Sequence, residues 1–172
     1  MSENVQSLLA TIENGTRENI WEAAKQLESI TVGVVSALLR LLKNGKSADA
    51  RAAAAYVLGF CKYSSARVDL EQVLDDTSEE AFVRGHAAEA LAYLGSRESV
   101  EMLLKHSEDR NPGVRYWCVF ALGEIGDPKS LPVLRHLLDK TGDKEVFEGH
   151  SLRGEILDAI AEITQQQGEA RS

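Results

Sequence analysis

The feature that most constrains the fold of this chain is an internal repeat of about 30 residues. Residues 83–95 superpose on residues 114–126 at an offset of 31, with Val, Arg, Ala, Leu and Gly in matching columns. The same columns recur 33 residues earlier at Arg51 and again around Ala23, and a further copy begins 38 residues after the best-formed unit, at Leu152. A period of this size indicates a solenoid, because each unit can bury its apolar side only against the next unit.

Each unit is predicted to be a helical hairpin. Apolar residues recur at i, i+3, i+4 and i+7 in the first half of each unit, and the second half repeats this spacing, as at Leu131, Leu134 and Leu138. Only 3 prolines and 6% aromatic residues agree with helices rather than a β-sandwich. We therefore predict an all-α fold, an α-solenoid with a right-handed superhelix, in a single domain. The expected hairpins cover residues 17–43, 47–75, 79–107 and 112–140, with capping helices near 5–13 and 147–165.

Several helix starts are marked by residues that favour the N-cap position. Asn111 and Asp127 each precede a proline, which suits the first turn of a helix. Thr77 is followed by a glutamate three residues later, the pattern of a capping box, and Ser47 and Thr31 are further expected caps. Helix starts are therefore better defined by the sequence than helix ends.

Two long phrases, NPGVRYWCVFALGEIGDPKSLPVLRHLL and AFVRGHAAEALAYLGSRESVEMLL, resemble the HEAT repeat. They are most similar to the short subtype found in phycobilisome-lyase-like HEAT proteins. The resemblance covers about 140 of the 172 residues and implies the α-solenoid fold. It leaves the function open, because this fold serves scaffolds, adaptors, bilin lyase subunits and a few enzymes.

Charge and composition exclude several classes of partner. Against 27 Asp and Glu there are 19 Lys and Arg, a net charge of -8, and the basic residues are scattered, so we expect no nucleic acid partner. No uncharged run approaches the roughly 20 residues that span a bilayer, and we expect no membrane contact and a cytoplasmic protein. Cys61 and Cys118 lie in apolar surroundings and are expected to be buried free thiols.

No catalytic or metal-binding motif stands out. The chain lacks GxSxG, P-loop and HExxH patterns, and its charge has the wrong sign for a HEAT-fold DNA glycosylase. One family of HEAT-repeat enzymes, deoxyhypusine hydroxylase, is known for binding iron through His-Glu dipeptides. At the corresponding place this chain has Gly85 and His86, and none of its 4 histidines is followed by Glu. His86 and Glu89 can share a helix face, but two ligands make a poor site, so we expect no metal, no cofactor and no catalytic residue.

An arginine column recurs near the start of the first helices. An anion-binding ladder is one interpretation of this column. The resemblance to HEAT proteins implies instead that these arginines pair with acidic loop residues such as Asp76 or Asp109, and we favour that structural role. The column consists of Arg51, Arg84, Arg115 and Arg153.

Two surfaces are predicted to bind a partner protein. The second helices are expected to line the concave side, where charges of both signs suit a polar protein surface better than a uniformly charged polymer, although a merely solvated face is the alternative. The second surface is an aromatic patch that either contacts a partner or a second copy of the chain, or is buried between units. The expected concave residues are Arg40, Glu71, Glu101, Lys105, Arg135 and His136, and the patch is Tyr116, Trp117 and Phe120.

From these observations we predict a non-catalytic HEAT-repeat module, not an enzyme, that binds another protein as an adaptor, scaffold or toxin-neutralising binder. The alternative is an accessory subunit of a bilin lyase or of another HEAT-fold enzyme.

The register of the repeat can be tested at Leu122, which the alignment places in the core of the best-formed unit. Leu122→Ala should lower the free energy of unfolding by about 2 to 5 kcal/mol, because it removes a buried side chain and leaves a cavity. Urea unfolding followed by circular dichroism measures this change. An unfolding curve equal to that of the wild type would show that the register is wrong.

Overall fold

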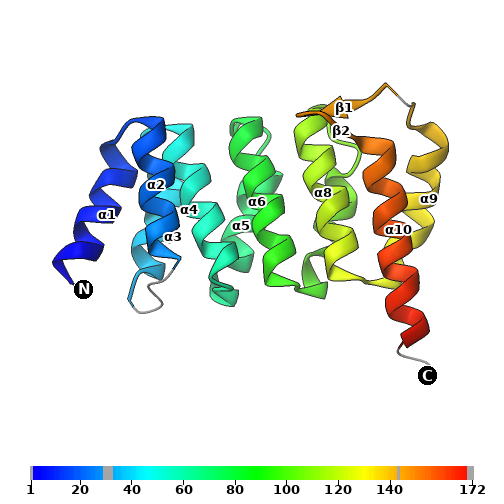
Figure 1. The fold of residues 1–172 in the computed structure, drawn as a ribbon, viewed down its shortest axis with the longest axis horizontal. Helices are drawn as coiled ribbons and strands as arrows, with labels where there is room; N and C mark the ends of the chain where they lie inside the picture. The colour runs from blue at the N-terminus through cyan, green and yellow to red at the C-terminus, as the bar shows by residue number, and fades with distance from the viewer. Residues whose placement is uncertain (1, 29–32, 143, 170–172) are drawn as a thin grey trace.

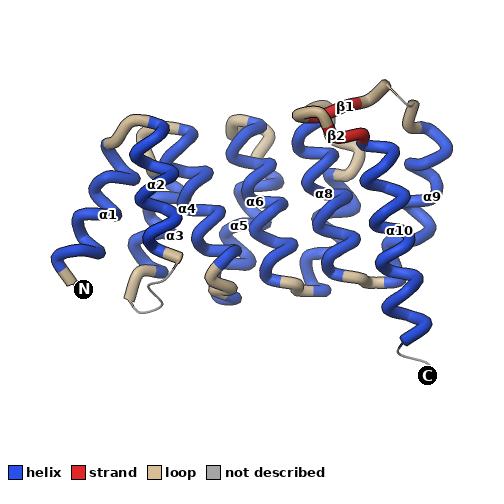
Figure 2. Tube along the Cα trace, in the orientation of Figure 1, coloured by secondary structure: helices blue, strands red, loops and turns tan. Residues whose placement is uncertain are grey.

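The structure, a computed structural model, describes residues 2–28, 33–142 and 144–169. Helices stack in two layers along one axis, and the two termini lie at opposite ends of the stack (Figure 1). Helices dominate the chain, with one short strand pair near the C-terminal end (Figure 2). The elements are α1 (Glu3–Asn14), α2 (Arg17–Leu27), α3 (Val35–Asn44), α4 (Ala48–Phe60), α5 (Arg67–Asp75), α6 (Ala81–Leu94), α7 (Val100–His106), α8 (Pro112–Ile125), α9 (Leu131–Lys140), β1 (Val146–Phe147), β2 (His150–Ser151) and α10 (Leu152–Glu169).

The first helices of the units, α2, α4, α6, α8 and α10, form one layer, and the second helices, α3, α5, α7 and α9, form the other (Figure 1). Small residues bring neighbouring first helices into close contact. A Cβ atom built on Gly59 of α4 would lie 2.4 Å from the Cα atom of Ala90 in α6, and one on Gly123 of α8 would lie 3.0 Å from Cα of Ala159 in α10. The predicted all-α solenoid is confirmed.

The N-caps follow the sequence in most places. The side chain of Asn111 accepts hydrogen bonds from the amides of Gly113 (2.9 Å) and Val114 (3.3 Å) at the start of α8. Ser47 caps α4, and Asp127 caps the short 3-10 turn Pro128–Ser130 that leads into α9. These three assignments are correct.

The expected cap at Thr77 is wrong. Helix α6 starts at Ala81, with Glu80 in the N-cap position and no side-chain cap. The reason is local competition, because the carboxylate of Asp76 accepts the amide of Ser78 at 2.9 Å and organises this turn itself. Thr31 lies outside the described residues.

The last helix, α10, begins at Leu152. The apolar pattern predicts a start near Phe147, and this prediction is wrong. Residues 146–151 form a two-stranded antiparallel hairpin in which Phe147 pairs with His150. Its two central residues, Glu148 and Gly149, have φ values of +48° and +87°. Positive φ at both positions matches the tight turn that the twist of a hairpin favours, so the chain turns here before it becomes helical.

The arginine column connects each unit to the next. Arg51 donates to the carbonyl oxygen of Gly45, which follows α3, at 2.8 Å, and its Nε atom lies 2.8 Å from a carboxylate oxygen of Glu79. The Nη1 atom of Arg153 lies 2.6 Å from the carbonyl oxygen of Leu138 in α9. Such carbonyls have no partner within their own helix, so the guanidinium groups cap the second helices.

Arg84 is the most buried member of this column. Its Nε atom donates to the carbonyl oxygen of Leu74 at 2.9 Å, and Nη2 lies 2.6 Å from Asp109 and 3.3 Å from Nδ1 of His106. Its neighbour Arg115 likewise donates to the carbonyl oxygen of Asp109 at 2.7 Å. Because these donors are used within the chain, the column is structural and not an anion-binding ladder.

Arg84→Met should lower the free energy of unfolding by about 3 to 5 kcal/mol, because it leaves the carboxylate of Asp109 without its buried cation. Urea unfolding at neutral pH measures the loss. Arg97→Met, at an exposed position between α6 and α7, is the matched control and should change stability by less than about 0.5 kcal/mol. Equal stability of the two variants would contradict the structural role of the column.

Candidate functional site

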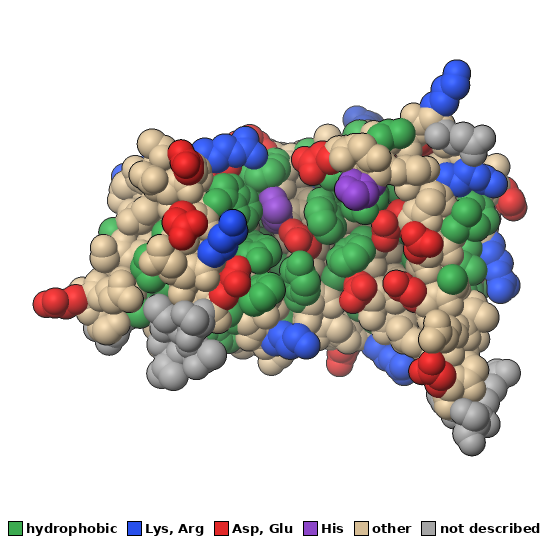
Figure 3. Space-filling model, viewed as in Figure 1, with side chains coloured by type: hydrophobic (Ala, Val, Ile, Leu, Met, Phe, Trp, Pro, Cys, Tyr) green, Lys and Arg blue, Asp and Glu red, His purple; other side chains and the backbone are tan. Residues whose placement is uncertain are grey.

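Aromatic side chains of the first helices form two groups of contacting rings along the outer side of their layer. Ring centroids lie 5.9 Å apart for Trp21 and Tyr56 and 5.5 Å apart for Trp117 and Phe120. Apolar side chains gather over this face, with carboxylates among them (Figure 3). We define the aromatic strip by Trp21, Tyr56, Phe60, Phe82, His86, Tyr93, Trp117 and Phe120.

Carboxylates accept hydrogen bonds from the polar groups of these rings. The hydroxyl of Tyr56 donates to Glu28 at 2.9 Å. Buried Glu89 accepts the hydroxyl of Tyr93 on Oε1 at 3.2 Å, and its Oε2 atom lies 2.7 Å from Nδ1 of His86. Burial, together with the charge of Glu89, raises the pKa of Tyr93 to about 12. The strip is therefore apolar, with acidic side chains, Glu28 and Glu89, beside the rings.

A cavity of about 240 Å³ opens between α6, α8 and the β1–β2 turn. Two glycines let aromatic rings lie directly on helix backbone. A Cβ atom on Gly85 would lie 3.1 Å from Cδ1 of Trp117, and one on Gly113 would lie 2.6 Å from Cε2 of Phe147. We call this cavity the α6–α8 pocket; its main walls are Phe82, Gly85, His86, Gly113, Trp117 and Phe147.

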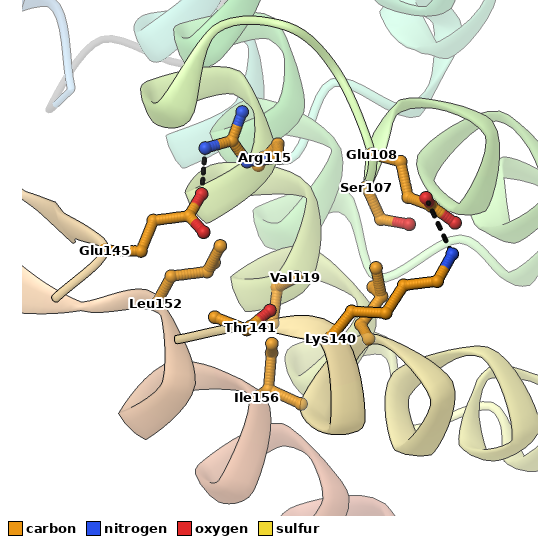
Figure 4. Close-up of a pocket in the computed structure, with 10 residues that line it drawn as sticks. Ser107, Glu108, Arg115, Val119, Lys140, Thr141, Glu145, Leu152 and Ile156 are labelled. Carbon is orange, nitrogen blue, oxygen red and sulfur yellow. Dashed lines mark hydrogen bonds and ion pairs between the residues drawn. The ribbon is translucent and has the colours of Figure 1, made fainter. Parts of the chain in front are cut away.

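A second cavity, of about 210 Å³, is lined by residues of α8, α9 and α10 together with Thr141 and Glu145 (Figure 4). Its charged residues are already paired with one another. Arg115 pairs with Glu145, and Nζ of Lys140 lies 3.5 Å from a carboxylate oxygen of Glu108. Because these pairs neutralise each other, we take the α6–α8 pocket as the candidate site.

The residues expected on the concave side all lie on the second helices, the layer behind the aromatic strip. Two of them are engaged within the chain. Glu71 accepts hydrogen bonds from Arg67 and Ser99, each at 2.8 Å, and Lys105 pairs with Asp75. Lys105 is exposed all the same, and so are Arg40, Glu101, Arg135 and His136.

The β1–β2 hairpin packs on one residue of the predicted aromatic patch, Tyr116, and the other two residues stay partly exposed. Tyr116 is buried, and its ring centroid lies 5.7 Å from that of Phe147 and 5.9 Å from that of His150. Burial and a hydrogen bond to Glu155 raise its pKa. Trp117 and Phe120 are half-buried, so they keep some surface for a ligand or partner.

Sequence reasoning did not find the pocket. Phe147 was assigned to a helix, and Phe82 was not singled out. The signal that could have revealed it is the alignment column in which Gly85 stands opposite Tyr116, next to the column of His86 and Trp117. A glycine beside large rings leaves room that an ordinary side chain would fill.

The histidines are separated by the fold. His86 bonds to Glu89, and buried His106 lies 2.7 Å from a carboxylate oxygen of Asp75. Among residues 2–28, 33–142 and 144–169, no group of three or more His, Cys, Asp or Glu side chains is placed to hold a metal ion. Both cysteines are free, and Cys118 is fully buried. None of the described helices is long and apolar enough to cross a membrane.

Comparison with known proteins identifies the repeats in one part of the chain. The model of the HEAT repeats matches residues 69–149. These residues are HEAT repeats. The fold of the whole chain is also similar to a chain in the complex of CpcE and CpcF of phycocyanin lyase from Nostoc sp. PCC7120, with a TM-score of 0.73, 20% identity and coverage of 90% of this chain and 96% of that chain. This likeness concerns the fold.

The curated relatives of this chain carry the name of an enzyme. The deoxyhypusine hydroxylase of Saccharomyces cerevisiae is 37% identical over 105 residues, which is 60% of this chain and 30% of the yeast protein. Deoxyhypusine hydroxylase-B of Oryza sativa is 35% identical over 107 residues, 62% of this chain and 35% of the rice protein. The chain thus matches only about a third of the length of these relatives.

These relatives overturn the predictions that the chain is a non-catalytic binding module and not an enzyme. The missing His-Glu dipeptide does not set this chain apart from these enzymes, because they match 60% and 62% of its length.

The environment of the tyrosines predicts how they titrate. Burial raises the pKa of all 4 tyrosine side chains. In the folded protein these phenols therefore stay protonated above pH 10, where free tyrosine ionises. The resulting stability is present below about pH 10 and is lost as the pH rises further.

At about pH 10.5 the folded protein should show much less tyrosinate absorbance than the urea-unfolded protein at the same pH. Tyr93→Phe should remove a step near pH 12 from the native titration. Equal absorbance of the folded and unfolded chains would contradict the described burial of these rings.

Proposed function

We propose that this chain is a subunit of a HEAT-fold enzyme, in which it supplies a binding pocket and pairs with a second HEAT-fold chain. The observation that carries the proposal is the position of the α6–α8 pocket. Its lining residues lie between Ala81 and Glu148, inside the segment 69–149 that matches the HEAT repeats. The relatives that bear the enzyme's name support an enzymatic context, and two free thiols suit the reducing cytoplasm.

The pocket residues do not fit a metal. The resemblance to deoxyhypusine hydroxylase implies iron ligands where this chain has Gly85 and His86, and here that place is the aromatic wall of the pocket. The Nδ1 atom of His86 is engaged by Glu89 at 2.7 Å. We therefore assign no metal-dependent step to this chain, and its proposed contribution is to bind a ligand and hold it beside the partner subunit.

Pairing with a second chain is supported by the fold neighbour, a phycocyanin lyase structure that contains two chains, CpcE and CpcF. The second-helix layer offers a surface for such pairing, because its exposed charges are of mixed sign. Complementary charges give an interface its specificity and speed of association. We propose Arg40, Glu101, Arg135 and His136 as its contact residues.

The test combines this chain with each HEAT-fold enzyme subunit encoded by the same organism. Light scattering after size exclusion gives the mass, which distinguishes a mixed pair from a pair of identical chains. We expect a complex of one to one and a higher turnover of the enzyme when this chain is present.

Charge reversal by Arg135→Glu should weaken the complex about tenfold, which corresponds to 1.4 kcal/mol. Lys25→Glu makes the same change of charge on an exposed position of the other layer and should have no effect. The proposal fails if every mixture keeps the separate masses and the turnover of each enzyme stays constant.

A further inference from the structure

We propose that the α6–α8 pocket binds an alkylated ammonium group, such as the trimethylammonium group of a small molecule or of a methylated lysine. This proposal rests on the proposed function, because it names the kind of ligand that the pocket of the enzyme subunit binds. Its test uses the isolated chain and does not need the partner.

The walls of the pocket are aromatic on three sides. Phe82 comes from α6, Trp117 from α8 and Phe147 from β1, so the rings converge from three different elements. The negative face of an aromatic ring attracts a cation, and cages of such rings bind quaternary ammonium groups. The volume of about 240 Å³ is below the 300 to 1,000 Å³ of typical ligand pockets, which favours a compact head group.

One of these rings already holds a cation within the chain. The guanidinium carbon of Arg17 lies 5.3 Å from the centroid of Phe82, and the Nε atom of Arg17 lies 3.3 Å from a carboxylate oxygen of Asp49. Acidic Glu148 lines the same cavity from the hairpin turn. The net charge of -8 further favours a positive ligand over a negative one.

His86 does not cancel this preference. Its Nδ1 atom lies 2.7 Å from the carboxylate of Glu89, which is buried. The pair carries a net charge of zero when the imidazole is protonated and of minus one when it is neutral. In neither state does this wall of the pocket repel a cation.

The hydrogen-bond acceptors of the pocket explain why the cation should be alkylated. The side-chain oxygen of Asn111 accepts the amides of Gly113 and Val114, which leaves Glu148 as the carboxylate among the lining residues. A primary ammonium group has three N–H donors that lose water on binding, and Glu148, on one side of the cavity, can accept from only part of them. A trimethylammonium group has no donor to satisfy.

Three small ligands separate these properties in calorimetric titrations of the whole chain. Choline is the trimethylammonium probe, 3,3-dimethyl-1-butanol is its neutral isostere, and ethanolamine is its primary amine. We expect choline to bind at least tenfold more tightly than either comparison ligand. Equal binding of choline and its neutral isostere, tighter binding of ethanolamine, or no heat with choline would each overturn the proposal.

Two peptides that differ only in the trimethylation of one lysine show whether the trimethylammonium group belongs to a protein side chain or to a small molecule. Tighter binding of the methylated peptide than of choline assigns the pocket to a protein side chain, and the reverse order assigns it to a small molecule. Both orders agree with the proposal, provided that the unmethylated peptide binds at least tenfold more weakly than the methylated one. Equal binding of the two peptides would overturn it.

Variants place the binding in this pocket. Trp117→Leu should weaken choline binding at least tenfold, and Phe147→Leu, in the hairpin outside the helical layers, gives a second test if the first variant unfolds. Phe120→Leu is the matched control, because Phe120 touches the ring of Trp117 but does not line the cavity. Unchanged choline affinity in the folded Trp117 and Phe147 variants would overturn the assignment. Loss of complex formation with a second subunit would instead remove the proposed function and leave these titrations unaffected.

Discussion

The hydrogen bonds between the arginine column and the ends of the second helices hold the rest of the structure in register. A helical hairpin leaves carbonyl groups unpaired at the end of its second helix, just where the first helix of the next unit begins. Arg51, Arg84, Arg115 and Arg153 each donate to such carbonyls. A guanidinium group has five donors in a planar fork, so it can bond a carbonyl and a carboxylate at the same time. The column thereby fixes the position of each first helix along its axis relative to the end of the second helix before it.

Close packing of the first helices explains why the aromatic residues lie outside. Contacts as near as those of Gly59 with Ala90 and of Gly123 with Ala159 leave no space for rings at these two crossings, between α4 and α6 and between α8 and α10. The larger side chains are therefore displaced to the free face of the layer, where they contact one another and the carboxylates of Glu28 and Glu89. Where Gly85 replaces a side chain on this face, the displaced rings enclose a pocket instead of a flat surface.

The sequence predicted the parts of the fold that repeat, because a repeat can be recognised by aligning segments of the sequence with one another. The solenoid followed from the columns of the alignment, the cap at Asn111 from the proline after it, and the structural use of the arginines from the resemblance to HEAT proteins. The hairpin at residues 146–151 did not, because its two strands are two residues long and its turn depends on the φ angles of Glu148 and Gly149. The pocket was missed for a related reason, since its walls come from two units and an insertion, whereas an alignment compares each unit only with its counterparts.

The insertion before α10 has a wider consequence. The last repeat is offset by 38 residues where the preceding one is offset by 31, and the additional length carries Phe147 and Glu148 to the edge of the pocket. Phe147 also packs against Tyr116 of α8, whereas Glu148 is exposed at the tip of the turn, so the residues that line the cavity from this hairpin differ in how much they contribute to the packing of the scaffold. In a solenoid, insertions between repeats are accommodated as loops on one face. Exchange of Glu148 at the tip of this hairpin would therefore be a direct route to new ligand preferences on an unchanged frame.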